Sequence, residues 1–567
     1  MVGKRRVRGV RRPGHRAGRG TRGLLAGAAG LLSLPAQAAE LPDRRGAPAF
    51  ESVRICSTYG VAFFYIPGTD TCLRLSGRAR FEYAYQPSFS RSGNNAGATP
   101  GDYSGYQARA RINLDARTQT DYGTLRSFLR LDTGSRTGFA TMHAGALNRI
   151  GGAFPATGLD QIGRVQQQFT VDKAFVQFAG VTAGRASSFF DFYAHDFEFI
   201  VATMGSDIPS TNLAAYTATM GKGLSATLSV EDPSFRHTPV YSAQNAVPRS
   251  VVDSGAQVFG PANPVTPIFV GFDAAGRPTG LGFVDTVQRN RMPDVIGVLR
   301  YDQSWGSAQV SGALHEVNHG QMDSFSFTGT NLGAPVTLGN NQAPRGPASA
   351  LGFAVQGGLK VNLPFIAAGD SLYLQAAYGE GAALYTGLPA YNGPWAQAAT
   401  AVQGAAFSQF FNDGVINPFT NRLELTSSVS FTAAMLHYWT PSVRSALFGS
   451  YGAMTFARGA REAQGAFFSF TNTGPGTPGT RFFDLSQVLR DSYRFVVGAN
   501  LIWSPVKEFD IGVEAIYTRY GPQKGRILDL GRFPNQNPAF VNNAANPVAT
   551  ASQVDAVQVR ARVQRDF

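Results

Sequence analysis

The sequence predicts an all-β protein: a transmembrane antiparallel β-barrel of about sixteen strands, with short periplasmic turns and long external loops. Two observations carry this prediction. Apolar and polar residues alternate with a period of two over long segments, and the connectors between those segments alternate between short and long. A soluble β-sandwich also alternates, but its strands usually have about five or six residues and its polar face meets bulk water.

The alternation is clearest at the two ends of the predicted barrel. In residues 73–86, "LRLSGRARFEYAYQ", one phase is apolar or small throughout, and the other is charged or polar except for one alanine. The same split recurs in residues 106–117 and 554–567. Segments of about ten or more residues suit tilted strands that cross a bilayer, with apolar side chains toward lipid and polar side chains toward an interior channel.

Sixteen such segments can be placed along the chain. They are residues 73–86, 106–117, 124–133, 171–179, 181–186, 212–220, 224–231, 294–302, 308–317, 351–363, 371–379, 423–438, 444–452, 493–503, 509–520 and 554–567. The short connectors include "TQTDYG", "GKG" and "WTPSV", whereas long ones span 232–293, 318–350 and 380–422. An even number of strands returns both ends to the same side, so the first and last strands can pair and leave no open edge in lipid.

Residues 1–38 have the architecture of a secretory signal peptide. Nine basic side chains and no acidic one lie within residues 1–23, the apolar run "LLAGAAGLLSL" follows, and "AQA" ends the segment. A basic nucleic-acid tail is the alternative, but it would not need the apolar run. Without those nine, 41 basic residues remain against 37 acidic ones, so the net charge falls from +13 to +4 and no nucleic-acid partner is expected. No later run of about eighteen apolar residues predicts a transmembrane helix.

An N-terminal extension, residues 39–72, is expected to precede the barrel of residues 73–567. The two cysteines, Cys56 and Cys72, lie in this extension and enclose fifteen residues. In an oxidising exported compartment they are expected to form a disulfide, whose closed loop would stabilise the fold by about 3 kcal/mol. A metal site would need histidine partners, and none lies nearby in the sequence.

One short motif, "HEVNH" from His315 to His319, matches the zinc-protease pattern H-E-x-x-H. Two histidines four positions apart share a zinc on a helix, but this motif is expected to begin at the outer end of a strand and run into a loop. Strand geometry separates such positions by about 13 Å. No nucleophile elbow and no phosphate-binding glycine loop is present in the sequence. We therefore expect no enzyme activity, no metal and no other cofactor.

Several blocks of the chain resemble the general porins of alphaproteobacteria. They are "VRICSTYGVAFFYIPGTDTCLRLSGRARFEY", "ARINLDARTQTDYGTLRSFLRLD", "KAFVQFAGVTAGRASSFFDFY" and the closing "VQVRARVQRDF", in family order. The resemblance implies a homotrimer among the lipids of a Gram-negative outer membrane and passive diffusion of small hydrophilic solutes. It also implies that the third loop folds into the lumen and that the assembly machinery reads the terminal strand with Phe567. Arg565 departs from the apolar or aromatic residue common at its position.

The inward phase of the terminal strands predicts a basic wall of the channel, because closure brings the first three strands and the last side by side. With Arg185 at the end of the fifth strand, the wall consists of Arg74, Arg78, Arg80, Arg109, Arg111, Arg126, Arg130, Arg185, Arg560 and Arg562. The third loop carries four carboxylates, which the resemblance places opposite this wall: Asp191, Asp196, Glu198 and Asp207. A transverse field between the two sets would orient dipolar solutes and bias ion passage.

Two other functions stay open on the sequence alone. A substrate-specific outer-membrane channel would leave the same strand pattern. A barrel adhesin or structural outer-membrane protein could use the long loops without leaving a motif, although it would not require the charged inward phase.

Overall fold

The computed structural model describes residues 54–85, 104–137, 165–208, 210–238, 240–241, 265–269, 281–285, 288–319, 322–323, 328–331, 334–337, 348–388, 407, 409, 411–417, 419–420, 422–467, 475–529 and 537–567. The expected signal peptide and residues 39–53 of the expected extension lie outside the described residues.

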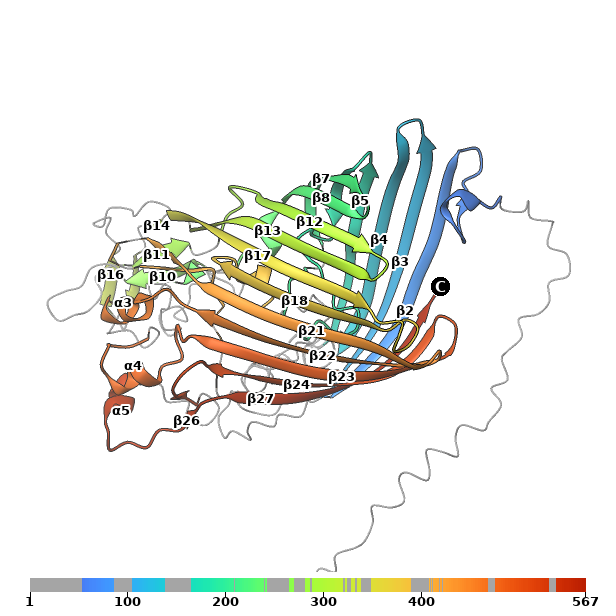
Figure 1. The fold of residues 1–567 in the computed structure, drawn as a ribbon. Coiled ribbons are helices and arrows are strands. Elements are labelled where there is room, and N and C mark those ends of the chain that lie inside the picture. Colours follow the sequence, from blue (N-terminus) through green and yellow to red (C-terminus); the bar gives the residue numbers. More distant parts are fainter. Residues whose placement is uncertain are drawn as a thin grey trace, which may run out of the picture. The chain divides into compact units, whose positions relative to one another are not determined.

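Sixteen antiparallel strands form one closed sheet (Figure 1). In chain order they are β2 (Thr71–Tyr85), β3 (Ser104–Thr120), β4 (Gly123–Thr137), β5 (Val165–Phe178), β6 (Val181–Ala186), β7 (Thr211–Gly221), β8 (Leu224–Glu231), β12 (Asp294–Gln303), β13 (Gly306–His319), β17 (Ala348–Asn362), β18 (Ser371–Glu380), β21 (Ser427–Thr440), β22 (Val443–Thr455), β23 (Ser492–Val506), β24 (Phe509–Pro522) and β27 (Val554–Asp566). Each pairs with the next strand of this ring. Most have ten to seventeen residues, enough for a tilted strand to cross a bilayer.

The first and last barrel strands, β2 and β27, close the ring in a register that places Arg78 opposite Asp566. The terminal residue extends this pairing. The Gly77 amide donates to the Phe567 carbonyl at 2.8 Å, and the Phe567 amide donates to the Gly77 carbonyl at 3.1 Å. Closure leaves no open strand edge in the wall. This matters because the hydrocarbon of a membrane cannot form hydrogen bonds with the unpaired backbone groups of such an edge.

The connectors differ at the two ends of the barrel (Figure 1). At the end where the C-terminus lies, here called the short-turn end, tight turns join neighbouring strands, such as residues 121–122 between β3 and β4 and 507–508 between β23 and β24. The long connectors leave from the opposite end. The predicted alternation of short and long connectors is therefore confirmed.

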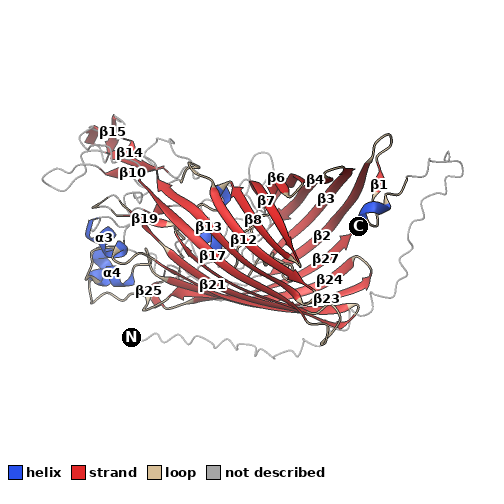
Figure 2. Cartoon of the chain, turned by 45° about the horizontal axis from the view of Figure 1, so that its top comes forward, coloured by secondary structure: helices blue, strands red, loops and turns tan. Residues whose placement is uncertain are grey.

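Short elements lie before the barrel and in the long connectors. They are η2 (Ser57–Tyr59), β1 (Phe64–Tyr65), η4 (Pro233–Phe235), β9 (Val240–Tyr241), β10 (Val265–Phe269), β11 (Leu281–Asp285), β14 (Met322–Asp323), β15 (Thr328–Asn331), β16 (Ala334–Thr337), η6 (Ala383–Thr386), β19 (Gly414–Ile416), β20 (Leu423–Leu425), α3 (Ala460–Phe467), α4 (Arg481–Leu485), β25 (Ile527–Leu528), α5 (Pro538–Asn542) and β26 (Thr550–Ala551). Helices α3 and α4 lie beyond the wall, at the end opposite the short turns (Figure 2). Across the described residues, no helix is long and apolar enough to cross a membrane.

Each of the sixteen predicted segments coincides with one barrel strand, but one of them begins too early. In the predicted segment 423–438, the first three residues form the separate strand β20, which pairs with β19. The barrel strand β21 begins only at Ser427. The period of two continues across this break, so the sequence pattern does not reveal it.

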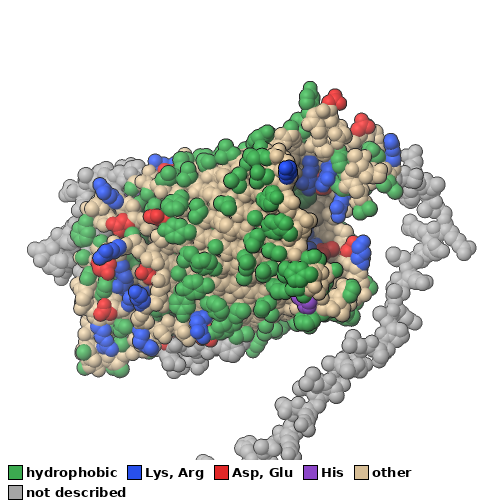
Figure 3. Space-filling view, viewed as in Figure 1, with side chains coloured by type: hydrophobic (Ala, Val, Ile, Leu, Met, Phe, Trp, Pro, Cys, Tyr) green, Lys and Arg blue, Asp and Glu red, His purple; other side chains and the backbone are tan. Residues whose placement is uncertain are grey.

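The outer wall of the barrel is apolar. Large hydrophobic side chains of the outward phase are exposed, among them Leu75, Val310, Phe431, Leu447 and Val513. They form a band along the wall, and charged side chains gather at the two ends (Figure 3). The inward phase is polar and mostly buried, as the strictly alternating burial along β27 illustrates. Apolar side chains outside and polar side chains inside are the arrangement of a barrel in lipid.

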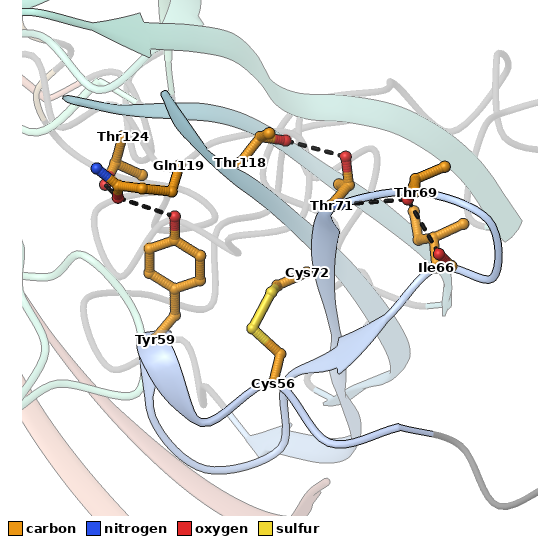
Figure 4. Close-up of a disulfide and its surroundings, with 9 residues drawn as sticks. All are labelled: Cys56, Tyr59, Ile66, Thr69, Thr71, Cys72, Thr118, Gln119 and Thr124. Carbon is orange, nitrogen blue, oxygen red and sulfur yellow. Dashed lines mark hydrogen bonds between the residues drawn. A yellow bond between two sulfur atoms is a disulfide. The ribbon is translucent and has the colours of Figure 1, made fainter. Parts of the chain in front are cut away.

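The segment before β2 is tied to the barrel at the short-turn end (Figure 4). The predicted disulfide between Cys56 and Cys72 is present, with Cα atoms 5.9 Å apart. Cys72 itself belongs to β2, so the bond anchors the segment directly to the wall. From η2, the Tyr59 hydroxyl donates to the Gln119 side chain of β3 at 3.3 Å.

Candidate functional site

The connector between β6 and β7 runs inside the barrel, and residues 187–208 and 210 of it are described; we call it the inner loop. Its first part is held by β13 and β17. The Ser311 hydroxyl donates to the Phe190 carbonyl at 2.9 Å, and the Gln356 amide donates to the same carbonyl at 2.8 Å. The Phe190 ring is fully buried and packs edge-on against Tyr385, with ring centroids 4.7 Å apart. These contacts fix the inner loop against the interior of the wall.

The rest of the inner loop is bonded in the same way to β18, β22, β23 and β24. The pairs are Tyr193 N to Gln375 Oε1 (3.0 Å), Met204 N to Ser450 Oγ (2.9 Å), Asn500 Nδ2 to Phe197 O (2.6 Å) and Phe199 N to Glu514 Oε2 (2.7 Å). At the far side, Arg562 of β27 donates to the Phe199 carbonyl, and its guanidinium lies 4.1 Å from the Phe199 ring centroid. The inner loop therefore lines the wall from β13 round to β27.

A polar cavity of about 630 Å³ lies between the inner loop and the interior of strands β2 to β5, β22 to β24 and β27. Its basic lining residues are Arg78, Arg80, Arg109, Arg111, Arg130, Lys173, Arg444 and Arg562. Its acidic lining residues are Glu82, Asp132, Asp172, Asp196, Glu198, Asp207, Asp510 and Asp566. The two sets are equal in number but unevenly placed. Most of the arginines come from β2, β3 and β4, whereas three of the carboxylates come from the inner loop.

Carboxylates of the basic wall are shared between arginines. Asp132 accepts from Arg109 at 2.6 Å and from Arg111 at 2.8 Å. Glu82 has three basic neighbours, at closest N to O distances of 2.5 Å for Arg562 and 3.6 Å for both Arg80 and Arg560. Charge-assisted bonds of this kind hold guanidinium groups in fixed orientations.

Six of the ten arginines predicted for the wall line the cavity. They are Arg78, Arg80, Arg109, Arg111, Arg130 and Arg562. Arg74 and Arg126 share the inward phase but lie nearer the short-turn end, where Arg126 pairs with Asp115 at 2.9 Å. Arg560 is buried one inward position beyond Arg562, beside Glu82.

The prediction for Arg185 is wrong. The buried, inward phase of β6 contains Thr182 and Ala186, so Arg185 falls on the other face of the strand. Its guanidinium donates to the Val171 carbonyl at 3.0 Å and lies 5.0 Å from the Phe235 ring centroid. The side chain is not part of the cavity lining.

Three of the four predicted carboxylates of the inner loop border the cavity. Asp196 is exposed there and Asp207 is half-buried. Glu198 is buried, and its carboxylate accepts from the backbone amides of Ala202 and Thr203 at 2.8 and 3.0 Å. Glu198 therefore holds a turn of the loop in addition to bordering the cavity.

The prediction for Asp191 is wrong. Its carboxylate accepts from Arg236 at 2.8 Å, and the Arg236 side chain is only 1% exposed. The Ser206 hydroxyl donates to the same carboxylate. Asp191 is absent from the cavity lining, because the buried arginine behind the loop holds it on the opposite side.

The charge of Asp207 depends on pH near neutrality. Burial raises the pKa of Asp207 to about 7, with a further contribution from Asp191 and Asp196, whereas His195 and Lys173 act in the opposite direction. Its carboxyl is therefore protonated in mildly acidic solution and ionised in mildly basic solution.

Seven charged residues of the lining belong to neither the predicted arginines nor the predicted loop carboxylates. They are Glu82, Asp132, Asp172, Lys173, Arg444, Asp510 and Asp566. Arg444 and Asp510 form an ion pair between β22 and β24 at 2.6 Å, and Asp566 pairs with Arg78 at 2.6 Å. These three lie in strands that the sequence predicts, so the same inward phase, applied to every strand, would have found them. Asp172 falls at a register shift between β4 and β5, which periodicity does not reveal.

The motif from His315 to His319 lies wholly within β13, so the prediction that it runs into a loop is wrong. Pairing with β17 continues to His319, opposite Ala348. His315 Nδ1 lies 2.8 Å from the Asp294 carboxylate, and positions four apart on a strand are separated by about 13 Å. In the part of the chain that the structure describes, no group of side chains is placed to hold a metal ion.

A closed barrel with an apolar outer wall, a charged lumen and a loop folded into that lumen defines a class of protein, the membrane channels of the porin type. The chain belongs to the porin subfamily, whose family model matches residues 46–447. The resemblance to porins of alphaproteobacteria is thereby confirmed, and the protein is located in the outer membrane of a Gram-negative bacterium.

Among characterised relatives, porin Omp2b of Brucella suis is 28% identical over 297 residues, which are 50% of this chain and 63% of that protein. Porin Omp2b of Brucella abortus (strain 2308) is 27% identical over the same length. The chain thus spans less than two thirds of the length of these relatives. Among solved structures, the outer membrane channel DcaP of Acinetobacter baumannii matches 89% of this chain and 99% of its own, with a TM-score of 0.45 and 13% identity.

Proposed function

We propose that this chain forms a water-filled channel through which small hydrophilic solutes and ions diffuse passively across the outer membrane. The charged cavity between the inner loop and the basic wall is the observation that carries this proposal. Ionised side chains in such number need water or opposite charges around them, because burying an ion without either is very costly. The apolar outer wall keeps the same strands in contact with outer-membrane lipid.

The proposed selectivity element is the space between the basic wall and the inner loop. Arg78 and Arg80 stand on one side, and Asp196 and Asp207 border the other. The field between them would orient dipolar solutes and retard apolar ones. Because basic and acidic lining residues are equal in number, the channel combines a local field with weak overall ion selectivity.

The proposal includes a homotrimer and assembly through the C-terminal strand. Membership of the porin subfamily supports both. The Phe567 side chain is 59% exposed at the end of β27, where the outer-membrane assembly machinery could bind it.

Liposome swelling and planar-bilayer recordings of the purified protein test this function. With sugars, amino acids and anions of graded size, we expect swelling rates to fall smoothly with solute size and not to saturate. Insertion of a trimer should raise the conductance in groups of three equal steps. Heat-modifiable migration on gels shows whether the barrel is folded. A folded protein that stays silent in bilayers would contradict a channel and favour an adhesive or structural barrel.

A substrate-specific channel is the second candidate, and the concentration of arginines on one side of the cavity favours it. Its signature would be saturable influx of one class of solute, with slow swelling for other solutes of the same size.

A further inference from the structure

Several inward-facing cross-strand pairs beside the cavity consist of two like charges. In register they are Arg78 opposite Arg111, Arg80 opposite Arg109, and Arg130 opposite Lys173. Directly opposite residues in an antiparallel sheet have Cβ atoms about 4.5 to 5.5 Å apart, and like charges there destabilise the sheet. Uncharged residues such as Gln309, Ser311 and Gln356 face the interior on the other side of the barrel. Uncharged polar side chains are enough to line a water-filled lumen, so the need for a hydrated interior does not explain the arginine pairs.

The wall arginines that line the cavity have too few carboxylates. Among the described residues, these six guanidinium groups have four carboxylates within ion-pairing distance, and three of the four are shared between arginines. Arg78 pairs with Asp566, Arg109 and Arg111 share Asp132, Arg111 and Arg130 share Asp172, and Arg80 and Arg562 share Glu82. Six positive charges against four negative ones leave an excess of two positive charges on this side of the cavity.

The excess is concentrated at Arg80. Its Nε donates to the neutral Gln564 side chain at 2.9 Å. Among the described residues, its closest carboxylate oxygen is Glu82 Oε1, at 3.6 Å, and that oxygen is already bonded to Arg562 at 2.5 Å. The side chains of Arg80, Arg109 and Arg111 are 12, 25 and 20% exposed and all line the cavity, so a solute in the cavity can reach them.

We propose that Arg80 and Arg109, with Arg78 and Arg111 in the adjacent row, form a transient binding site for the phosphate group of a small solute. This inference rests on the proposed channel function. The planar guanidinium fork matches the oxygens of a phosphate in bidentate geometry. A phosphate dianion brings the two negative charges that the cluster lacks, whereas a carboxylate brings only one. Partial solvation of the arginines allows the solute to leave again.

Planar bilayers containing the full-length protein test the site, with inorganic phosphate as the probe. In a chloride salt at about pH 8, where phosphate is mainly a dianion, added phosphate should lower the chloride current along a saturable curve. Acetate at the same ionic strength should not do so. An acetate effect equal to that of phosphate would overturn the assignment to phosphate.

Arg80→Lys separates a binding site from a general field, because it keeps the charge and removes the planar fork. We expect the half-inhibiting phosphate concentration to rise at least about tenfold, the usual loss for a charge-assisted bidentate contact. Arg74→Lys, on the same face of the same strand but outside the cavity lining, is the matched control and should behave as the wild type.

Inhibition of Arg80→Lys by phosphate at wild-type concentrations would refute the site and leave the channel function intact. Thermal unfolding in detergent gives a measurement that is independent of conductance, since a ligand that binds the native state raises its stability. Phosphate should raise the unfolding temperature of the wild type and of Arg74→Lys more than that of Arg80→Lys. An equal rise in unfolding temperature for all three proteins would refute the binding site, whether or not the barrel conducts. A lack of conductance would be a separate result, and it would contradict the proposed channel function.

Discussion

Replacing Arg78 and Arg80 together with alanine should shift the channel toward cations. Both guanidinium groups line the cavity, and their loss leaves six basic lining residues against eight carboxylates. One of those carboxylates, Asp566, also loses its ion-pair partner at 2.6 Å. The change therefore removes positive charge and exposes negative charge on the same side of the lumen.

The size of the shift follows from Coulomb's law. An ion passing about 7 Å from one charge in water interacts with it by about 0.6 kcal/mol, and screening at physiological ionic strength leaves about 0.25 kcal/mol. Removing two positive charges thus stabilises a cation by about 0.5 kcal/mol and destabilises an anion by the same amount. The ratio of cation to anion permeability should rise about fivefold.

Reversal potentials across a potassium chloride gradient measure this ratio directly. Arg185→Ala serves as the control, because that arginine lies outside the cavity lining and should leave the ratio unchanged. A rise of less than about twofold is too small for charges beside the ion path at this screening length. Such a result, or a shift toward anions, would show that the two arginines do not border the path of the ions.

Three further predictions use other parts of the barrel. Burial raises the pKa of Asp207 to about 7, so this carboxyl loses its proton as the pH rises from about 6 to about 8, and the preference of the channel for cations should increase. Asp207→Asn should abolish most of this increase in planar-bilayer recordings. If the cation preference of Asp207→Asn rose with pH as in the wild type, Asp207 would be excluded as the cause. A Cβ at Gly77 would lie 2.4 Å from the Phe567 ring, so Gly77→Ala should cost about 1 to 3 kcal/mol and lower the temperature at which the folded gel band is lost. Gly357→Ala is the control, because a Cβ at Gly357 meets open space, and it should leave that temperature unchanged. An equal fall in temperature for both variants would argue against a clash at Gly77. Replacing both cysteines with serine removes a cross-link that stabilises the fold by about 3 kcal/mol. Protease should then cleave within residues 57–71, while the conductance stays that of the wild type. Resistance to protease equal to that of the wild type would show that packing on β3 holds this segment without the disulfide.

The wall of the barrel could be predicted from the sequence, because lipid and lumen impose opposite demands on successive residues. Along β2 and β27 the side chains that point to lipid are mainly apolar, and those between them, which point to the lumen, are mostly polar. The period of two therefore identifies the strands and their inward face together. Even the arginines of the cavity follow from this phase. The error at Arg185 shows the limit of the rule: β6 is a short strand, and with few residues the phase is easily assigned to the wrong face.

The orientation of side chains on the inner loop could not be predicted in this way. Asp191 and Asp196 are five residues apart on the same segment, yet one is buried against Arg236 and the other borders the cavity. A loop has no period that relates position to direction. Its path is set by contacts with residues far away in the sequence, and Arg236 is such a contact.

The distribution of residue types around the lumen explains where the inner loop lies. On β13, β17, β18 and β22 the interior side chains that meet the loop are amides and hydroxyls, such as Gln356 and Ser450, which satisfy its buried backbone groups. On β2, β3 and β4 the side chains that line the cavity are mostly arginines. Stripping water from them would be costly without further partners. The loop therefore packs mainly against strands with neutral interior side chains, and the arginine-rich strands border the open space. The position of the channel within the barrel therefore depends on the inward side chains of each strand: the loop occupies the side where they are mainly neutral, and the channel runs beside the strands that carry the arginines.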